Sequence, residues 1–136
     1  METQIKQTVW GTRSVSFWIT LILASGIIFI GLRFIMLPHV GAVGYGVSFN
    51  NVSDAAYGQI KGIRDIFTGI SLLPLLIMRM RKAVASVFTA AVIVPVADFF
   101  IVLSNNGAAD TEHLLIHGIT ALAMIVNSIL LFQTKP

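Results

Sequence analysis

The sequence predicts an all-α fold: a four-transmembrane-helix bundle with its N and C termini cytoplasmic. Two observations predict it. Hydrophobic residues make up 56% of the 136 residues and charged residues only 11%, far below the roughly 25% that a soluble domain carries. The apolar residues also fall in long unbroken runs, whereas a membrane β-barrel needs alternating strands of about ten residues. The length allows one integral membrane domain, residues 1–136.

Four apolar runs are long enough, or nearly so, to cross a hydrocarbon core of about 30 Å as helices. These runs are Ser14–Met36, Ile63–Met80, Ala83–Leu103 and Leu114–Phe132. With their polar ends included, the predicted spans cover about 14–36, 57–80, 83–103 and 113–133.

Basic residues beside the spans set the orientation, because they stay on the cytoplasmic side. Six basic residues fall on one face of the four-span arrangement: Lys6, Arg13, Arg79, Arg81, Lys82 and Lys135. The loop 37–52 and the short loop with Asp110 and Glu112 fall on the other face. The predicted location is a membrane that the chain crosses several times, the plasma (inner) membrane being the one we expect, although the sequence leaves open which membrane it is.

The outer loop 37–52 and the helix-breaking residues shape the bundle. The loop is rich in glycine and bounded by Pro38, and a plain connector would be shorter, so we expect an ordered lid or re-entrant segment. Pro74 and Pro95 lie within spans and favour kinks. Gly62 and the glycine four residues before it let helices approach closely.

Composition excludes several kinds of function. The chain has no cysteine, which excludes disulfides, thiol catalysis and Cys-ligated metal centres. The pI of 9.7 and the net charge of +3 report topology in a membrane protein, so no nucleic-acid partner is expected. We expect no cofactor. The expected partners are the lipid bilayer, a small lipophilic ligand and further copies of the chain in a homo-oligomer.

Each predicted span places an ionisable side chain in one outer layer of the membrane. Counted from the inner face at 1.5 Å per residue, the layer lies roughly 22–28 Å up. Its members are Arg33, Arg64 with Asp65, Asp98 and His117. A charge within a span costs roughly 2.5–3.5 kcal/mol, so these groups should face inward and pair.

Helical phase supports an inward orientation, because residues three or four apart share a face. One polar face on the last span holds His113, His117, Thr120 and Asn127. A similar stripe on the second span holds Asp54, Tyr57, Lys61, Asp65 and Thr68, with Arg64 on its flank. Two such stripes predict a polar cavity in the outer half of the bundle.

The residue types in this cavity are suited to acid–base chemistry. A buried histidine beside a carboxylate and an arginine can exchange protons near neutral pH. The predicted catalytic residues are Asp98, His117 and His113. The predicted substrate-binding residues are Arg33, Arg64, Asp65, Lys61 and Tyr57, with the arginines orienting an anionic or carbonyl oxygen and Asp65 holding an arginine in place.

Two other interpretations use the same residues. A structural ion-pair network of Arg33 and Arg64 with Asp65 and Asp98 would only fix helix packing, although interhelical polar contacts average just about 0.6 kcal/mol. His113 and His117 stand at i, i+4, a spacing that suits zinc, but no metalloprotease motif surrounds them. We predict no metal, and the spacing alone leaves open whether the two histidines bind one.

Several of these residues form a pattern that resembles a known family. The pattern is Gly31-Leu32-Arg33, then Lys61-Gly62-Ile63-Arg64-Asp65, then Asp98, then a histidine that opens the last span. It resembles the small four-helix membrane proteins of domain of unknown function 4267, which are distantly DoxX-like, over about 26–131. The resemblance implies a four-helix membrane bundle with these polar positions, and it implies no activity.

The predicted function is binding of a small lipophilic molecule in the outer polar cavity, extended to its conversion by acid–base chemistry. The alternatives are a small transporter or channel subunit, and a non-catalytic accessory subunit of a membrane complex. The polar residues of the inner half are few, which disfavours transport: Thr20, Ser71, Ser86, Thr89 and Asn127. The sequence leaves open whether the molecule is an enzyme.

Overall fold

The computed structural model describes residues 10–133, and within this range the chain is helical and without strands. This confirms the predicted all-α class. The elements in chain order are α1 (Val15–Met36), α2 (Pro38–Tyr45), the 3-10 turn η1 (Val52–Asp54), α3 (Ala55–Ile77), α4 (Arg81–Ala91), α5 (Ile93–Asn106) and α6 (Thr111–Gln133).

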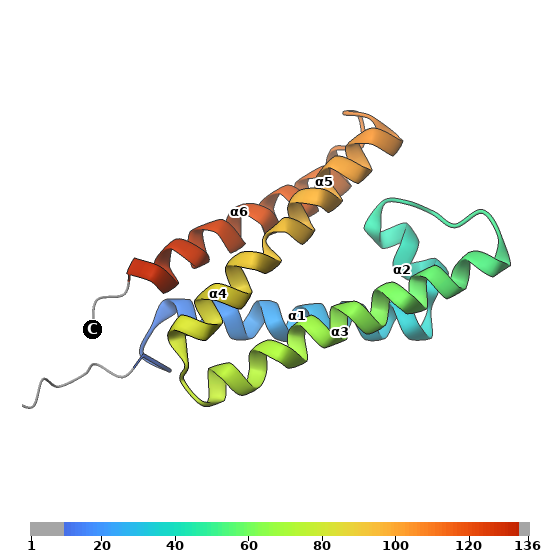
Figure 1. The fold of residues 1–136 in the computed structure, drawn as a ribbon. Coiled ribbons are helices and arrows are strands. Elements are labelled where there is room, and N and C mark those ends of the chain that lie inside the picture. The colour runs from blue at the N-terminus through green and yellow to red at the C-terminus, as the bar shows by residue number, and fades with distance from the viewer. Residues whose placement is uncertain (1–9, 134–136) are drawn as a thin grey trace, which may run out of the picture.

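The helices form two arms (Figure 1). The first arm consists of antiparallel α1 and α3, with α2 and η1 at one end, and the second consists of α4, α5 and α6. The arms are joined where α3 contacts α4 and where α1 contacts α6. They diverge toward the turn between α5 and α6. Both ends of the described chain and the α3–α4 turn lie at the joined end.

The first arm is held together by a close approach of two backbones. A Cβ atom added to Gly62 on α3 would lie 2.5 Å from the carbonyl oxygen of Gly31 on α1, and one added to Gly31 would lie 2.6 Å from the carbonyl oxygen of Gly62. Only glycine fits at both positions. The predicted role of Gly62 in helix packing is therefore confirmed, and this contact fixes the register of α1 against α3.

The joined end contains the apolar core. Leu76 of α3, Val84 and Phe88 of α4 and Leu131 of α6 are each at most 1% exposed. Between membrane helices, such side chains stabilise the fold through van der Waals packing, because lipid is as apolar as the side chains themselves. The guanidinium of Arg81 also donates to the carbonyl oxygen of Leu131 over 2.8 Å, which ties the start of α4 to the end of α6.

The long helix of the second arm is interrupted at Val92, between α4 and α5. Pro95 has no N–H to donate to the carbonyl oxygen of Ala91, four residues earlier. Just before it, the N–H of Val92 donates to the carbonyl oxygen of Thr89, three residues earlier, over 3.2 Å. This turn is tighter than that of an α-helix, in which the bond reaches four residues back. The predicted kink at Pro95 is thus confirmed, whereas α3 runs through Pro74 without a break.

Three helical stretches are long and apolar enough to cross a membrane: Val15–Met36, Arg81–Asn106 and Thr111–Gln133. They support a membrane protein. The predicted fourth span, 57–80, falls on α3, which is not among them. The reason is local, because any stretch of α3 long enough to span contains Lys61, Arg64 and Asp65.

Candidate functional site

The predicted ordered segment of the outer loop contains the helix α2. Pro38 at its first turn suits a helix start, since proline lacks the N–H that would be unpaired there. Gly46 ends it with a φ of 104°, a left-handed conformation that favours glycine. A Cβ on Gly46 would also lie 2.9 Å from the Cβ of His113. The chain at Tyr45 and Gly46 is thereby held against the second arm.

Tyr45 connects α2 to α5. Its hydroxyl donates a hydrogen bond of 2.8 Å to Oδ1 of Asp98. Burial, followed by this bond to the Asp98 carboxylate, raises the pKa of Tyr45 well above its usual range. The hydroxyl therefore keeps its proton and acts as the donor in the bond.

His117 of α6 completes the group. Its Nε2 lies 2.8 Å from the carbonyl oxygen of Tyr45, and a carbonyl can only accept, so Nε2 carries a proton. Its Nδ1 lies 3.9 Å from Oδ2 of Asp98, beyond hydrogen-bond distance. The rings of Tyr45 and His117 meet edge to face with centroids 4.8 Å apart. We call Tyr45, Asp98 and His117 the three-helix cluster.

A second pair lies on α3 beside this cluster. Nζ of Lys61 donates to Oδ2 of Asp65 over 2.6 Å, and Asp65 is only 6% exposed. The same ammonium lies 4.8 Å from the ring centroid of Phe34 and 5.4 Å from that of Tyr45. Cations are attracted to aromatic faces within about 6 Å. Lys61 therefore links the pair on α3 to the three-helix cluster.

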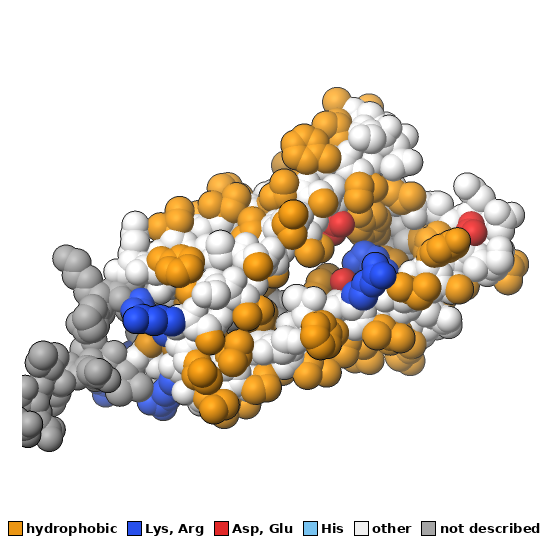
Figure 2. All heavy atoms as spheres, in the orientation of Figure 1, with side chains coloured by type: hydrophobic (Ala, Val, Ile, Leu, Met, Phe, Trp, Pro, Cys, Tyr) orange, Lys and Arg blue, Asp and Glu red, His pale blue; other side chains and the backbone are white. Residues whose placement is uncertain are grey.

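The pairing expected for Arg33 and Arg64 is not found. Both side chains are exposed, and within residues 10–133 neither forms an ion pair. Asp65 pairs with Lys61 instead, because these residues are four apart and face each other along α3, whereas Arg64 lies about 100° around the helix from Asp65. Figure 2 shows acidic and basic side chains facing one another across the opening between the arms.

His113 belongs to a different group from His117. Its Nδ1 lies 2.8 Å from Oδ1 of Asp110, and the amide of Asn106 donates both to Asp110 and to the carbonyl oxygen of Gly46. The hydrogen bond from Asn106, followed by that from His113, lowers the pKa of Asp110. This group, which we call the loop latch, ties α2 to the α5–α6 turn. Within the part of the chain described, no three His, Asp or Glu side chains converge on a point that a metal ion could occupy.

Sequence reasoning missed Tyr45 and selected Tyr57 instead. Tyr57 is 71% exposed on α3. The period of α3 placed Tyr57 on the polar stripe, but no periodicity reports on a residue in a glycine-rich loop. The length of the outer loop did predict an ordered lid or re-entrant segment, and this was the one available signal for Tyr45.

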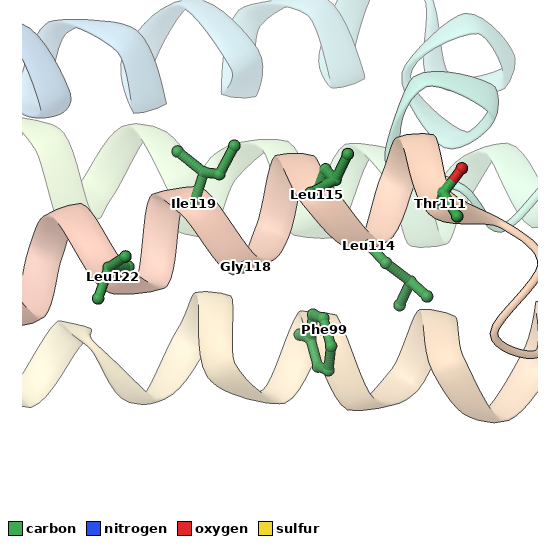
Figure 3. A pocket seen from close by; sticks show the side chains of 7 residues that line it. All are labelled: Phe99, Thr111, Leu114, Leu115, Gly118, Ile119 and Leu122. Atoms are coloured by element: carbon green, nitrogen blue, oxygen red, sulfur yellow. The ribbon is translucent and has the colours of Figure 1, made fainter.

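An apolar groove of about 350 Å³ lies on the surface of α5 and α6 (Figure 3). Its lining is Phe99, Thr111, Leu114, Leu115, Gly118, Ile119 and Leu122. Gly118 leaves the space open, since a Cβ there would lie 3.5 Å from the Phe99 ring. None of these residues was selected from the sequence. Phe99 and Gly118 directly follow Asp98 and His117 in the chain, but the groove offers no charged group for chemistry.

Comparison with known proteins gives one result. No curated protein and no solved structure shows significant similarity to the chain. The family model described as "Domain of unknown function (DUF4267)" matches residues 24–131, which is well over half of the chain and includes all three members of the three-helix cluster. The chain therefore belongs to the DUF4267 family.

Proposed function

We propose that the chain crosses the plasma (inner) membrane four times, with both termini cytoplasmic. In this arrangement α3 is the second span. Its 23 residues extend about 34 Å at 1.5 Å per residue, enough for a hydrocarbon core of about 30 Å. The pairing of Lys61 with Asp65 and their contacts with Phe34 and Tyr45 reduce the cost of their charges within the bundle.

The function that we propose is binding of a small lipophilic molecule in a polar cavity between the arms, and its conversion by acid–base chemistry. The observation that carries this proposal is the three-helix cluster. Tyr45, Asp98 and His117 come from three different helices, and their polar atoms meet within 2.8–3.9 Å. Such groups inside a membrane bundle are costly and characteristically functional.

The geometry of His117 favours proton exchange. Because Nε2 already carries a proton, neutral His117 presents a bare Nδ1 lone pair to Oδ2 of Asp98. Two lone pairs facing each other repel, and one proton on either atom relieves the repulsion. We therefore propose that Asp98 and His117 together hold one exchangeable proton, with Tyr45 fixing the orientation of the carboxylate.

The remaining predicted residues take supporting roles in this proposal. Lys61 and Asp65 set the charge beside the cluster, and the exposed Arg33 and Arg64 contact the ligand. His113 acts through the loop latch that positions α2. The proposed partners are the bilayer, the lipophilic ligand and further copies of the chain.

A channel fits this fold less well than a binding site closed at one end. At the joined end, Thr20 and Asn127 are fully buried and hydrogen-bonded to each other over 2.8 Å. Leu76, Phe88 and Leu131 fill the space around the same end with at most 1% exposure. A path across the membrane would require this packed core to open.

Binding is tested with the protein in lipid nanodiscs and four unbranched probes of ten carbons each: decanoate, decyl phosphate, decylamine and decanol. We expect saturable binding of at least one probe, beyond partition into empty nanodiscs. Asp98→Asn should weaken it, whereas Glu112→Gln, a matched charge removal at an exposed residue outside the cluster, should not. Partition equal to that of empty nanodiscs for all four probes would overturn the proposal.

Conversion is tested separately with methyl nonyl ketone in D2O. Removal of a proton beside the carbonyl and return of a deuteron from solvent leaves a labelled ketone that mass spectrometry detects. We expect the wild-type protein and Glu112→Gln to accelerate this exchange, and His117→Gln to lose the acceleration. Exchange by His117→Gln at the wild-type rate would remove His117 from the proposed chemistry.

A further inference from the structure

Among the ionisable groups at the diverging end of the arms, Arg64 shares with Arg33 the lack of an ion pair within the described residues. Lys61 has Asp65 at 2.6 Å, Asp98 has the Tyr45 hydroxyl at 2.8 Å, and His113 has Asp110 at 2.8 Å. No comparable partner of Arg64 exists among residues 10–133. Its backbone carbonyl accepts from Thr68, but its guanidinium has no anionic partner.

The register of α1 and α3 places Arg64 below the outer end of the bundle. Gly62 lies against Gly31, and the two helices are antiparallel (Figure 1). Arg64, two residues past Gly62, is therefore level with about Phe29 of α1, which continues to Met36. Seven residues of helix correspond to roughly 10 Å. In the proposed four-span arrangement, the backbone of Arg64 therefore lies within the hydrocarbon region.

The local charge balance then leaves the positive charge of Arg64 unmatched, as is that of Arg33 in the last turn of α1. Lys61 and Asp65 cancel. Asp98 and His117 also cancel when they hold one proton between them, as proposed above. The charge of Arg64 remains without a counter-charge at a depth where charges are costly. An anion is the missing component.

From this we propose that Arg64 binds the anionic head group of a lipophilic molecule, a carboxylate or a phosphate, beside the three-helix cluster. The proposal rests on the proposed function and specifies the class of its ligand. The planar guanidinium offers parallel N–H donors that match the oxygens of both groups in bidentate fashion, which a lysine ammonium does not. Figure 2 shows basic side chains at the opening between the arms, where such a head group would enter.

The same four probes also test this inference, in nanodiscs made of phosphatidylcholine, a zwitterionic lipid with no net charge. We expect decanoate or decyl phosphate to bind at least about tenfold more tightly than decanol and decylamine, as hydrogen bonds to charged groups imply. Arg64→Gln should remove this preference, and Arg64→Lys should keep part of it. Arg13→Gln, which removes an exposed arginine near the joined end, should keep it in full.

The outcomes separate the inference from the function on which it rests. Binding of decanol or decylamine with equal or higher affinity would overturn the anionic class while leaving the binding function intact. A preference for anions that survives in Arg64→Gln would overturn the role of Arg64. Binding of decyl phosphate but not of decanoate would identify the phosphate of a lipid head group as the ligand. The reverse would identify a fatty carboxylate. Inorganic phosphate, which has no chain, should displace neither probe.

Discussion

The close contact of α1 and α3 gives the sharpest prediction for stability. Adding a Cβ to Gly62 places it 2.5 Å from the Gly31 carbonyl oxygen and 2.8 Å from Cγ1 of Ile35, whereas ordinary contact begins near 3.4 Å. Gly62→Ala therefore forces the helices about 0.9 Å apart or distorts them, an overpacking that costs about 1–3 kcal/mol. The higher helix propensity of alanine returns at most about 1 kcal/mol. We expect a net destabilisation of up to about 2 kcal/mol.

The matched control is Gly26→Ala on α1, the helix against which Gly62 of α3 packs. A Cβ at Gly26 meets nothing within 4 Å, so only the helix propensity acts, and this variant should be as stable as the wild type or up to about 1 kcal/mol more stable. Unfolding in mixed micelles with rising sodium dodecyl sulfate, followed by circular dichroism, measures both. Equal effects of the two substitutions would refute the backbone contact between Gly31 and Gly62.

Three more predictions follow from single features. Ser128 is buried and its Oγ has no hydrogen-bond partner, so Ser128→Ala should raise the free energy of unfolding by about 1 kcal/mol; a loss in the same micelle assay would contradict this. The lowered pKa of Asp110 means that its contribution to stability is present above its unfolded pKa of about 3.9 and is lost as the pH falls toward the folded value. Asp110→Asn should therefore flatten the acid side of the stability–pH profile, and an unchanged profile would rule out the loop latch. The natural chain has no cysteine, so a single introduced cysteine is the only site that a maleimide can label. If the chain crosses the membrane four times, Lys82→Cys and Ala108→Cys should react with an impermeant maleimide from opposite sides. Labelling of both from the same side would exclude the four-span arrangement.

Much of the helical architecture could be predicted because apolar run length is a local property. The predicted spans 14–36 and 113–133 lie within two residues of the ends of α1 and α6, and the interruption before Pro95 followed from proline's missing N–H. The family assignment also followed from local patterns, chiefly the Gly-Ile-Arg-Asp stretch 62–65. The distant DoxX-like relationship stays a prediction.

The partners of the charged groups could not be predicted, because depth along a helix does not determine direction around it. Arg64 and Asp98 were placed at similar depth, but Asp98 meets a tyrosine from α2, a helix that no apolar run announces. Lys61 was on the correct stripe, and its i, i+4 spacing to Asp65 was the better guide to pairing than depth. Tyr45 required knowledge of how the outer loop folds, which depends on contacts with both arms.

In the proposed site, Tyr45, Asp98 and His117 meet inside the bundle, and Asp98 and His117 share one exchangeable proton. Solid-state NMR of the protein in lipid bilayers, with labelled histidine, tyrosine and aspartate, tests it most directly. We expect a His117 ring protonated at Nε2 and through-space contacts from this ring to the Tyr45 ring, 4.8 Å away between centroids, and to the Asp98 carboxyl carbon. A His117 ring protonated at Nδ1 alone, or the absence of both contacts, would contradict it.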